Sequence, residues 1–186
     1  MSPRGSYMQN QNELIQLALS AGAKKATVIR AEDIVVSSAF RDICASNSCG
    51  MYGKCWMCPP DIGAIDELMA RLKRYSHGLL YQTIYQIEDS FDIEGMGEAG
   101  ADHERVSQAV DEAVKSLLPA RLHLSCGGCH LCPRCARLDD QPCRQPEKAL
   151  PPMEGYGIDV YKTTQPTELK YINGQNTVTF FGIVLY

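Results

Sequence analysis

Residues 126–143 read CGGCHLCPRCARLDDQPC, and this stretch determines how the rest of the chain is interpreted. Cysteine recurs at every third position from Cys126 to Cys135, and a further cysteine follows at Cys143. Thiols two residues apart in a loop can converge on one metal centre, because the short turn brings successive sulfurs close together. The stretch therefore predicts a loop that binds metal.

The spacing favours an iron–sulfur cluster over zinc. A 4Fe–4S cluster of the ferredoxin type takes three thiolates from a C-x-x-C-x-x-C loop and a fourth from a distant cysteine beside a proline. We expect these four ligands to be Cys129, Cys132, Cys135 and Cys143. Cys126 is then one too many, and it either replaces Cys135 as a ligand or is a spare or redox-active thiol. Structural zinc sites, the alternative, usually separate two C-x-x-C pairs by about a dozen residues or more.

Four more cysteines lie in residues 44–58, which read CASNSCGMYGKCWMC and predict a second metal-binding loop. They are Cys44, Cys49, Cys55 and Cys58. Their irregular spacing is less specific than that of the later run, so the sequence predicts one or two clusters. A disulfide framework is the structural alternative, but the odd total of nine cysteines fits it poorly.

Length and composition describe an ordinary globular chain. The 186 residues, 45% of them apolar and 22% charged, suffice for one domain with a sizeable core. We expect residues 1–10 to form a disordered lead-in and residues 11–186 to form a single metal-binding domain. The net charge of −4 argues against binding to nucleic acid or to an anionic membrane. No apolar run approaches the roughly 20 residues needed to span a bilayer, and no signal peptide is recognisable. We therefore expect a cytoplasmic protein whose thiols are kept reduced.

Hydrophobic periodicity predicts an α+β fold. Apolar residues at helical spacing predict helices, and alternating or continuous apolar runs predict strands. The predicted helices are 12–21, 64–75, 102–118 and a short one at 153–164, and the predicted strands are 25–30, 79–88, 121–125 and 177–186. The last strand, TVTFFGIVLY, is nearly all apolar and so is expected at the centre of the sheet. These elements predict a mixed or antiparallel sheet covered by helices, with cysteine-rich loops at 44–58 and 126–143.

Outside the cysteines, the sequence contains no familiar catalytic motif. The four histidines are scattered and do not have the spacing of a metalloprotease or a catalytic triad: His77, His103, His123 and His130. Residues 89–100, DSFDIEGMGEAG, are predicted as a loop, and its acidic side chains are interpreted as solvated rather than as a cation site. Catalytic residues stay unassigned.

The motifs C-x4-C-x2-YG-x2-W-x-CPP, GCHLCPRCARLDDQPCRQP and MEGYGIDV resemble those of a predicted metal-binding family, domain of unknown function 2284. The resemblance extends to EDSFDIEGM and NTVTFFGIVLY and so covers nearly all of the chain after Ser37. It implies a cysteine-ligated metal centre of iron–sulfur type in the cytoplasm of an anaerobic prokaryote, but no particular reaction. The cysteines that match the family's pattern are Cys44, Cys49, Cys58, Cys129, Cys132, Cys135 and Cys143. Cys55 and Cys126 stand where other residues are often found.

Three functions of different classes follow from these features. The first is an electron-transfer protein that exchanges electrons with a partner enzyme through one or two 4Fe–4S clusters. The second is a redox enzyme in which Cys55 is not a ligand, so that one iron of the first-loop cluster is open to substrate. The third is a zinc-stabilised interaction protein without a redox role.

Overall fold

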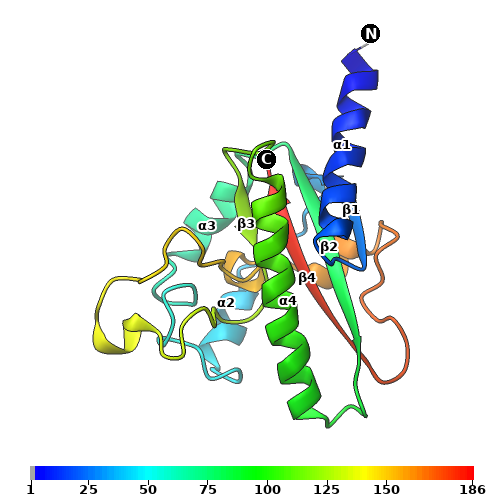
Figure 1. Ribbon diagram of the computed structural model, residues 1–186. Helices are drawn as coiled ribbons and strands as arrows, with labels where there is room; N and C mark the ends of the chain where they lie inside the picture. Colours follow the sequence, from blue (N-terminus) through cyan, green and yellow to red (C-terminus); the bar gives the residue numbers. More distant parts are fainter. Residues whose placement is uncertain (1–2) are drawn as a thin grey trace.

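The computed structural model describes residues 3–186 and has a four-stranded sheet with the strand order β1-β2-β4-β3 (Figure 1). All three strand pairings are antiparallel, which confirms the α+β fold class and selects the antiparallel form of the predicted sheet. The strands are β1 (Lys25–Arg30), β2 (His77–Gln86), β3 (Leu122–Leu124) and β4 (Thr177–Leu185).

The long strands β2 and β4 lie at the centre of the sheet. They pair from Gly78 opposite Leu185 to Gln86 opposite Thr177. Neighbouring side chains of a strand point to opposite faces, so both faces of an apolar strand have to be covered. The prediction that 177–186 forms a central strand is therefore confirmed.

One face of the sheet is covered by α1 (Pro3–Ser20) and α4 (Ile93–Val114). Leu14 of α1 and Val110 of α4 are fully buried against Leu79 and Tyr81 of β2. Figure 1 shows the long α4 crossing in front of the sheet. Burial of this apolar surface stabilises the fold by roughly 25 cal/mol for each Å² removed from water.

The opposite face packs against shorter elements and loops. They are the 3-10 helices η1 (Ala31–Asp33) and η3 (Glu154–Tyr156) and the α-helices α3 (Ile65–Leu72) and α5 (Val160–Thr164). The helix α2 (Ala39–Ala45) contacts η3, and the 3-10 helix η2 (Ala136–Asp139) lies within the second cysteine-rich stretch. Leu68 and Leu72 of α3 and Tyr156 of η3 join Leu80 and Ile183 of the sheet in a second apolar core. No helix in the described part of the chain has the length and apolar character needed to cross a bilayer.

Helix α4 begins earlier than predicted, and it takes in residues 93–100 of the stretch 89–100 that was expected to be a loop. Asp92 caps the helix at this earlier start. Its carboxylate accepts a hydrogen bond from the Gly95 N–H at 2.8 Å and another from the Glu88 N–H at 2.9 Å. Such a cap satisfies amides that the first turn of a helix leaves unpaired.

The predicted helix 153–164 is wrong in extent, because the structure divides it into η3 and α5. Gly157 ends η3 with a φ of 76°, a left-handed conformation that glycine adopts without steric cost. Asp159 then caps α5 by accepting a hydrogen bond from the Lys162 N–H. At the other end of the chain, α1 begins at Pro3 and includes most of residues 1–10, the expected disordered lead-in. Residues 1–2 lie outside the described residues, and the division into lead-in and domain stays a prediction.

We predict that Gly182→Ala lowers the free energy of unfolding by about 2 kcal/mol, because it overpacks the sheet. Gly182 lies opposite Tyr81, and a Cβ atom at this position would overlap the Tyr81 hydroxyl. The matched change Gly97→Ala introduces a Cβ that meets no atom within 4 Å in the interior of α4. It is expected to raise stability by about 0.5–1 kcal/mol. Urea unfolding of both variants measures the two changes in the free energy of unfolding. Equal changes in Gly182→Ala and Gly97→Ala would contradict the prediction.

Candidate metal centre

The first cysteine loop, residues 44–58, follows directly from α2, with Cys44 in the last turn of that helix. Its backbone folds back on itself through hydrogen bonds from the Tyr52 N–H to the Asn47 side chain at 3.0 Å and from the Gly53 N–H to the Pro59 carbonyl at 2.8 Å. The short x-x turn is closed by the Cys58 N–H, which donates to the Cys55 carbonyl at 2.9 Å. This turn brings the last two cysteines of the loop together.

The second cysteine loop, residues 126–143, starts where β3 ends. Ser125 is held there by backbone hydrogen bonds to Pro151 and Met153, both at 2.8 Å. Beyond Cys143, the Arg144 guanidinium donates to the Arg134 carbonyl at 2.8 Å, and the Gln145 amide donates to the Leu131 carbonyl at 3.0 Å. The segment after the loop is therefore fastened back onto the loop itself.

Four cysteines of the second loop line one small cavity of about 20 Å³, together with Arg144 and Gln145. These four are Cys129, Cys132, Cys135 and Cys143. Nitrogen donors point at their sulfurs: the Gln145 Nε2 donates to the Cys132 Sγ at 3.5 Å, and the Leu131 N–H donates to the Cys129 sulfur. The four residues that the ferredoxin-like spacing singles out therefore border the same small cavity, and their role as ligands stays a prediction.

The cysteines of the first loop differ in their burial. Cys55 and Cys58 are buried, Cys44 is half-buried, and Cys49 is exposed. The Cys55 sulfur accepts hydrogen bonds from Cys129 and Cys58, and these bonds hold its pKa below the ordinary value. The hydrogen bond that Cys58 donates to Cys55 raises the pKa of the Cys58 thiol. Burial and the nearby thiols of Cys49 and Cys44 act in the same direction. These interactions indicate that all four first-loop thiols lie in one neighbourhood.

Cys55 joins the two sets of cysteines. Its hydrogen bond with Cys129 connects the first loop to the second, although the two residues are far apart in the chain. Further contacts support this junction: the Trp56 indole N–H donates to the Gln141 carbonyl at 2.8 Å, and Arg137 forms an ion pair with Asp61 at 2.7 Å. The Arg137 guanidinium also lies 5.3 Å from the centre of the Trp56 ring. The sequence did not predict that the two loops touch.

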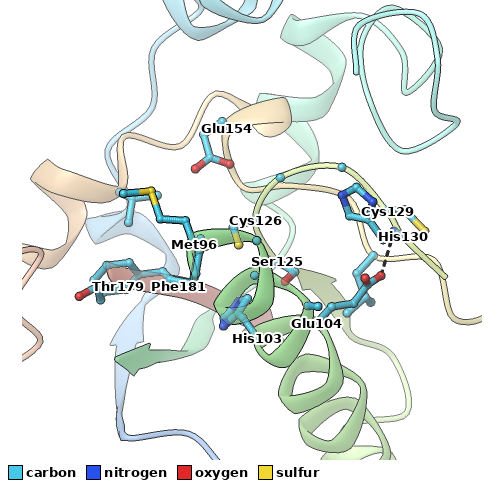
Figure 2. A pocket seen from close by; sticks show the side chains of 18 of the residues that line it. Met96, His103, Glu104, Ser125, Cys126, Cys129, His130, Glu154, Thr179 and Phe181 are labelled. Atoms are coloured by element: carbon cyan, nitrogen blue, oxygen red, sulfur yellow. Dashed lines mark hydrogen bonds between the residues drawn. The ribbon is translucent and has the colours of Figure 1, made fainter. Parts of the chain in front are cut away.

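Cys126 lies apart from the small cavity of the other four. It lines a larger cavity of about 660 Å³, here called the main cavity, together with His103 and Glu154 (Figure 2). Burial raises the pKa of its thiol, and nearby Glu154 and Glu104 act in the same direction. Both alternatives for Cys126, a ligand or a spare or redox-active thiol, stay predictions. Cys129 lines both the main cavity and the small cavity, so the two share a wall.

Within the described residues, no three His, Cys, Asp or Glu side chains are placed closely enough to hold a single metal ion. The thiols gather instead in two neighbouring sets that meet at Cys55. The donor set is rich in sulfur and is supplied with N–H groups, which suits an iron–sulfur cluster.

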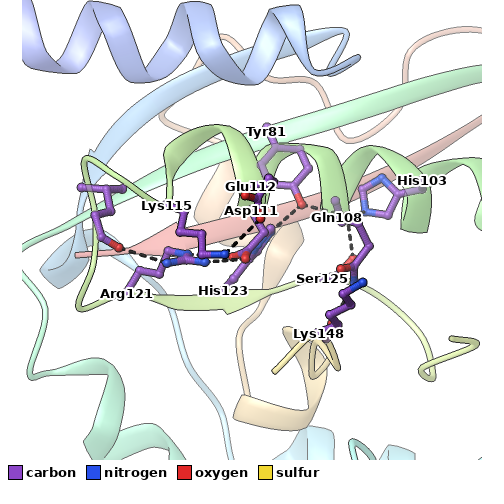
Figure 3. A network of polar contacts seen from close by, with 12 residues as sticks. Tyr81, His103, Gln108, Asp111, Glu112, Lys115, Arg121, His123, Ser125 and Lys148 are labelled. Carbon is purple, nitrogen blue, oxygen red and sulfur yellow. Dashed lines mark hydrogen bonds and ion pairs between the residues drawn. The ribbon is translucent and has the colours of Figure 1, made fainter. Parts of the chain in front are cut away.

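A chain of buried hydrogen bonds runs between α4 and the sheet (Figure 3). Asp111 contacts the His123 Nδ1 at 3.1 Å, and the His123 Nε2 is 2.8 Å from the Tyr81 hydroxyl. That hydroxyl donates to Ser107 at 2.8 Å, and the Ser107 hydroxyl is 3.0 Å from that of Ser125. This row of hydrogen bonds therefore reaches Ser125, the residue that precedes Cys126.

A second histidine, His103, joins the same row of hydrogen bonds. The His103 Nδ1 is 2.8 Å from the Thr83 hydroxyl, and its Nε2 is 3.4 Å from Ser107. Burial lowers the pKa of His103 to about 4, and it also lowers the pKa of His123. The His103 ring is therefore neutral near neutral pH.

Sequence reasoning treated these histidines as scattered, but one signal was present. His103, Ser107 and Asp111 recur at four-residue intervals along α4, so they lie on the face of the helix that meets the sheet. The acidic residues before α4 have a simpler role, because Asp92 caps the helix and Asp89 accepts a hydrogen bond from the Phe91 N–H at 2.7 Å.

Two cysteine-rich stretches that meet on a small α+β domain are typical of proteins that bind metal through thiolates. The model of one such family, described as predicted metal-binding protein (domain of unknown function 2284), matches residues 27–186, and the chain belongs to that family. No curated protein and no solved structure matches the chain.

We predict that stability falls as the pH drops from about 6.5 to about 4. His103 binds a proton more weakly in the folded protein than in the unfolded chain. Its contribution to the free energy of unfolding is therefore complete only at pH values above about 6.5, its pKa in the unfolded chain. Its loss at acid pH amounts to about 3 kcal/mol, and His123 acts in the same direction. Chemical unfolding across this pH range should show a shallower decline for His103→Gln than for wild type. His130→Gln is the control, and equal slopes for wild type and His103→Gln would contradict the assignment.

Proposed function

We propose that this protein carries iron–sulfur clusters and transfers electrons to or from a partner enzyme. The observation that carries the proposal is the convergence of four second-loop thiols on one small cavity: Cys129, Cys132, Cys135 and Cys143. Three of them come from the C-x-x-C-x-x-C loop and the fourth lies further along the chain beside a proline, a pattern that resembles ferredoxin-type 4Fe–4S ligation. When bound, the cluster would supply one-electron chemistry.

Neighbouring groups support a negatively charged cluster at this position. The Gln145 amide and the Leu131 N–H donate to cysteine sulfurs, and Arg144 places a positive charge in the cavity wall. Hydrogen bonds to sulfur and nearby positive charge raise the reduction potential of such clusters. These residues would therefore adjust how readily the centre accepts an electron.

The first loop offers ligands for a second cluster. Its candidates are Cys44, Cys49, Cys55 and Cys58. The contact between Cys55 and Cys129 brings the two sets side by side, which favours electron exchange between them. Cys49 is exposed, so one edge of the first set reaches the surface where a redox partner protein would dock. Reduced thiols suit a cytoplasmic location.

A redox enzyme is the second candidate function, and the main cavity favours it. That cavity shares Cys129 with the small cavity, so a small molecule bound there would lie beside the proposed cluster. If Cys55 is not a metal ligand, an iron of the first cluster would be left open. The substitution Cys55→Ser distinguishes the cases, because loss of the first cluster's spectrum assigns Cys55 as a ligand.

We expect Cys132→Ser to lose roughly half of the bound iron and acid-labile sulfide, because one of two clusters loses a ligand. Cys126→Ser is the matched control and should retain both at the wild-type level. Metal and sulfide analysis of anaerobically purified protein, with EPR after dithionite reduction, measures the outcome. Stoichiometric zinc without sulfide would replace the proposal with a zinc-stabilised interaction protein.

A further inference from the structure

The main cavity has the size and construction of a small-molecule site. Its volume of about 660 Å³ lies within the range of roughly 300–1,000 Å³ that is usual for ligand pockets. α4 forms one side, β4 contributes Phe180 and Phe181, and the start of the second cysteine loop forms another wall. Tyr171 and Leu150 add further apolar surface.

Two glycines of α4 keep this cavity open. Gly97 and Gly100 both line it, although each lies in the interior of a helix, where glycine costs about 1 kcal/mol relative to alanine. Packing does not require them: a Cβ at Gly97 would meet no atom within 4 Å, and one at Gly100 would meet only the Phe180 Cζ, at 3.8 Å. The helix therefore gives up some of its own stability at the cavity wall.

The charged groups of the cavity are all acidic. Glu104 and Glu154 line it, and no lysine or arginine does so among the described residues. The Glu104 carboxylate accepts a hydrogen bond from the His130 N–H at 3.1 Å. Burial raises the pKa of the Glu154 carboxyl, its own backbone N–H opposes that shift, and no side chain of the described chain donates to it. A cation bound beside the carboxyl would favour its ionised form. Figure 2 shows this carboxyl directed toward the side of the cavity where Met96 and Cys126 lie.

We propose that the main cavity binds an organic cation, an amine with an apolar or aromatic body, whose charged nitrogen pairs with Glu154. The body would lie against Phe180 and Tyr171, where an aromatic face also attracts a cation. An anion would meet two carboxyls and no lysine or arginine among the residues that line the cavity. A neutral molecule would fill the space without satisfying Glu154. This proposal goes beyond electron transfer and does not depend on which metal the cysteines hold.

Three probes of nearly equal size test the charge assignment: phenethylamine, 2-phenylethanol and phenylacetate. Isothermal titration calorimetry uses the full chain, purified anaerobically with its metal, near neutral pH. We expect phenethylamine to bind at least about tenfold more tightly than 2-phenylethanol, and phenylacetate to show no binding. Glu154→Gln should reduce the amine to the affinity of the alcohol. Glu98→Gln, an equal charge change at an exposed position of α4, should change nothing.

Two substitutions that fill the cavity test its location. Gly97→Leu and Gly100→Leu should each weaken binding of both the amine and the alcohol by about tenfold or more. Circular dichroism melts establish that each variant is folded, and Gly97→Leu enters open space, so it is expected to fold. Equal binding of all three probes, or amine binding that survives Glu154→Gln and both leucine variants, would overturn the proposal.

Iron and sulfide are measured on the same samples. A full cluster content without amine binding at about 10 mM probe would overturn this inference and leave the electron-transfer function standing. Amine binding to a protein without iron or sulfide would overturn the electron-transfer function and leave this inference standing.

Discussion

The antiparallel pairing of β2 with β4 is the constraint on which the cysteine-rich end of the molecule depends. β2 holds β1 on its other edge, and the chain between these two strands contains the first cysteine loop. β4 holds β3 on its other edge, and β3 leads directly into the second cysteine loop. One sheet therefore supports both loops, and contacts such as Trp56 with Gln141 then hold them together. In Figure 1 the two loops lie together to one side of the sheet.

The same pairing leaves room for the buried polar chain. Gly182 of β4 lies opposite Tyr81, and because it has no side chain the tyrosine hydroxyl is free to reach Ser107 and His123. Buried polar groups are costly unless they are hydrogen-bonded, so this row of side chains is held as a unit. It connects the wall of the main cavity, at Ser125, with Asp111, which lines a separate cavity of about 640 Å³ that Cys143 also borders.

Much of the framework could be predicted from local signals. The apolar run TVTFFGIVLY specified a central strand, and the cysteine spacing of the second loop selected the four residues that line one cavity. The start of α4 was missed because the capping role of Asp92 was not recognised in the sequence. The contact of Cys55 with Cys129 and the meeting of His103 and His123 at Tyr81 are long-range events, and no local periodicity reports them.

The junction at Cys55 has a practical consequence for anyone who handles the protein. Sulfurs that lie within hydrogen-bonding reach of one another are also poised to join covalently when molecular oxygen removes two electrons and two protons from a pair of thiols. A bond from Cys55 to Cys129 would staple the loops shut and remove two candidate ligands at once. A sample prepared in air would then be well folded and still unable to take up metal. The absence of colour in such a sample would result from oxidation during preparation and would not show that the reduced protein lacks a cluster.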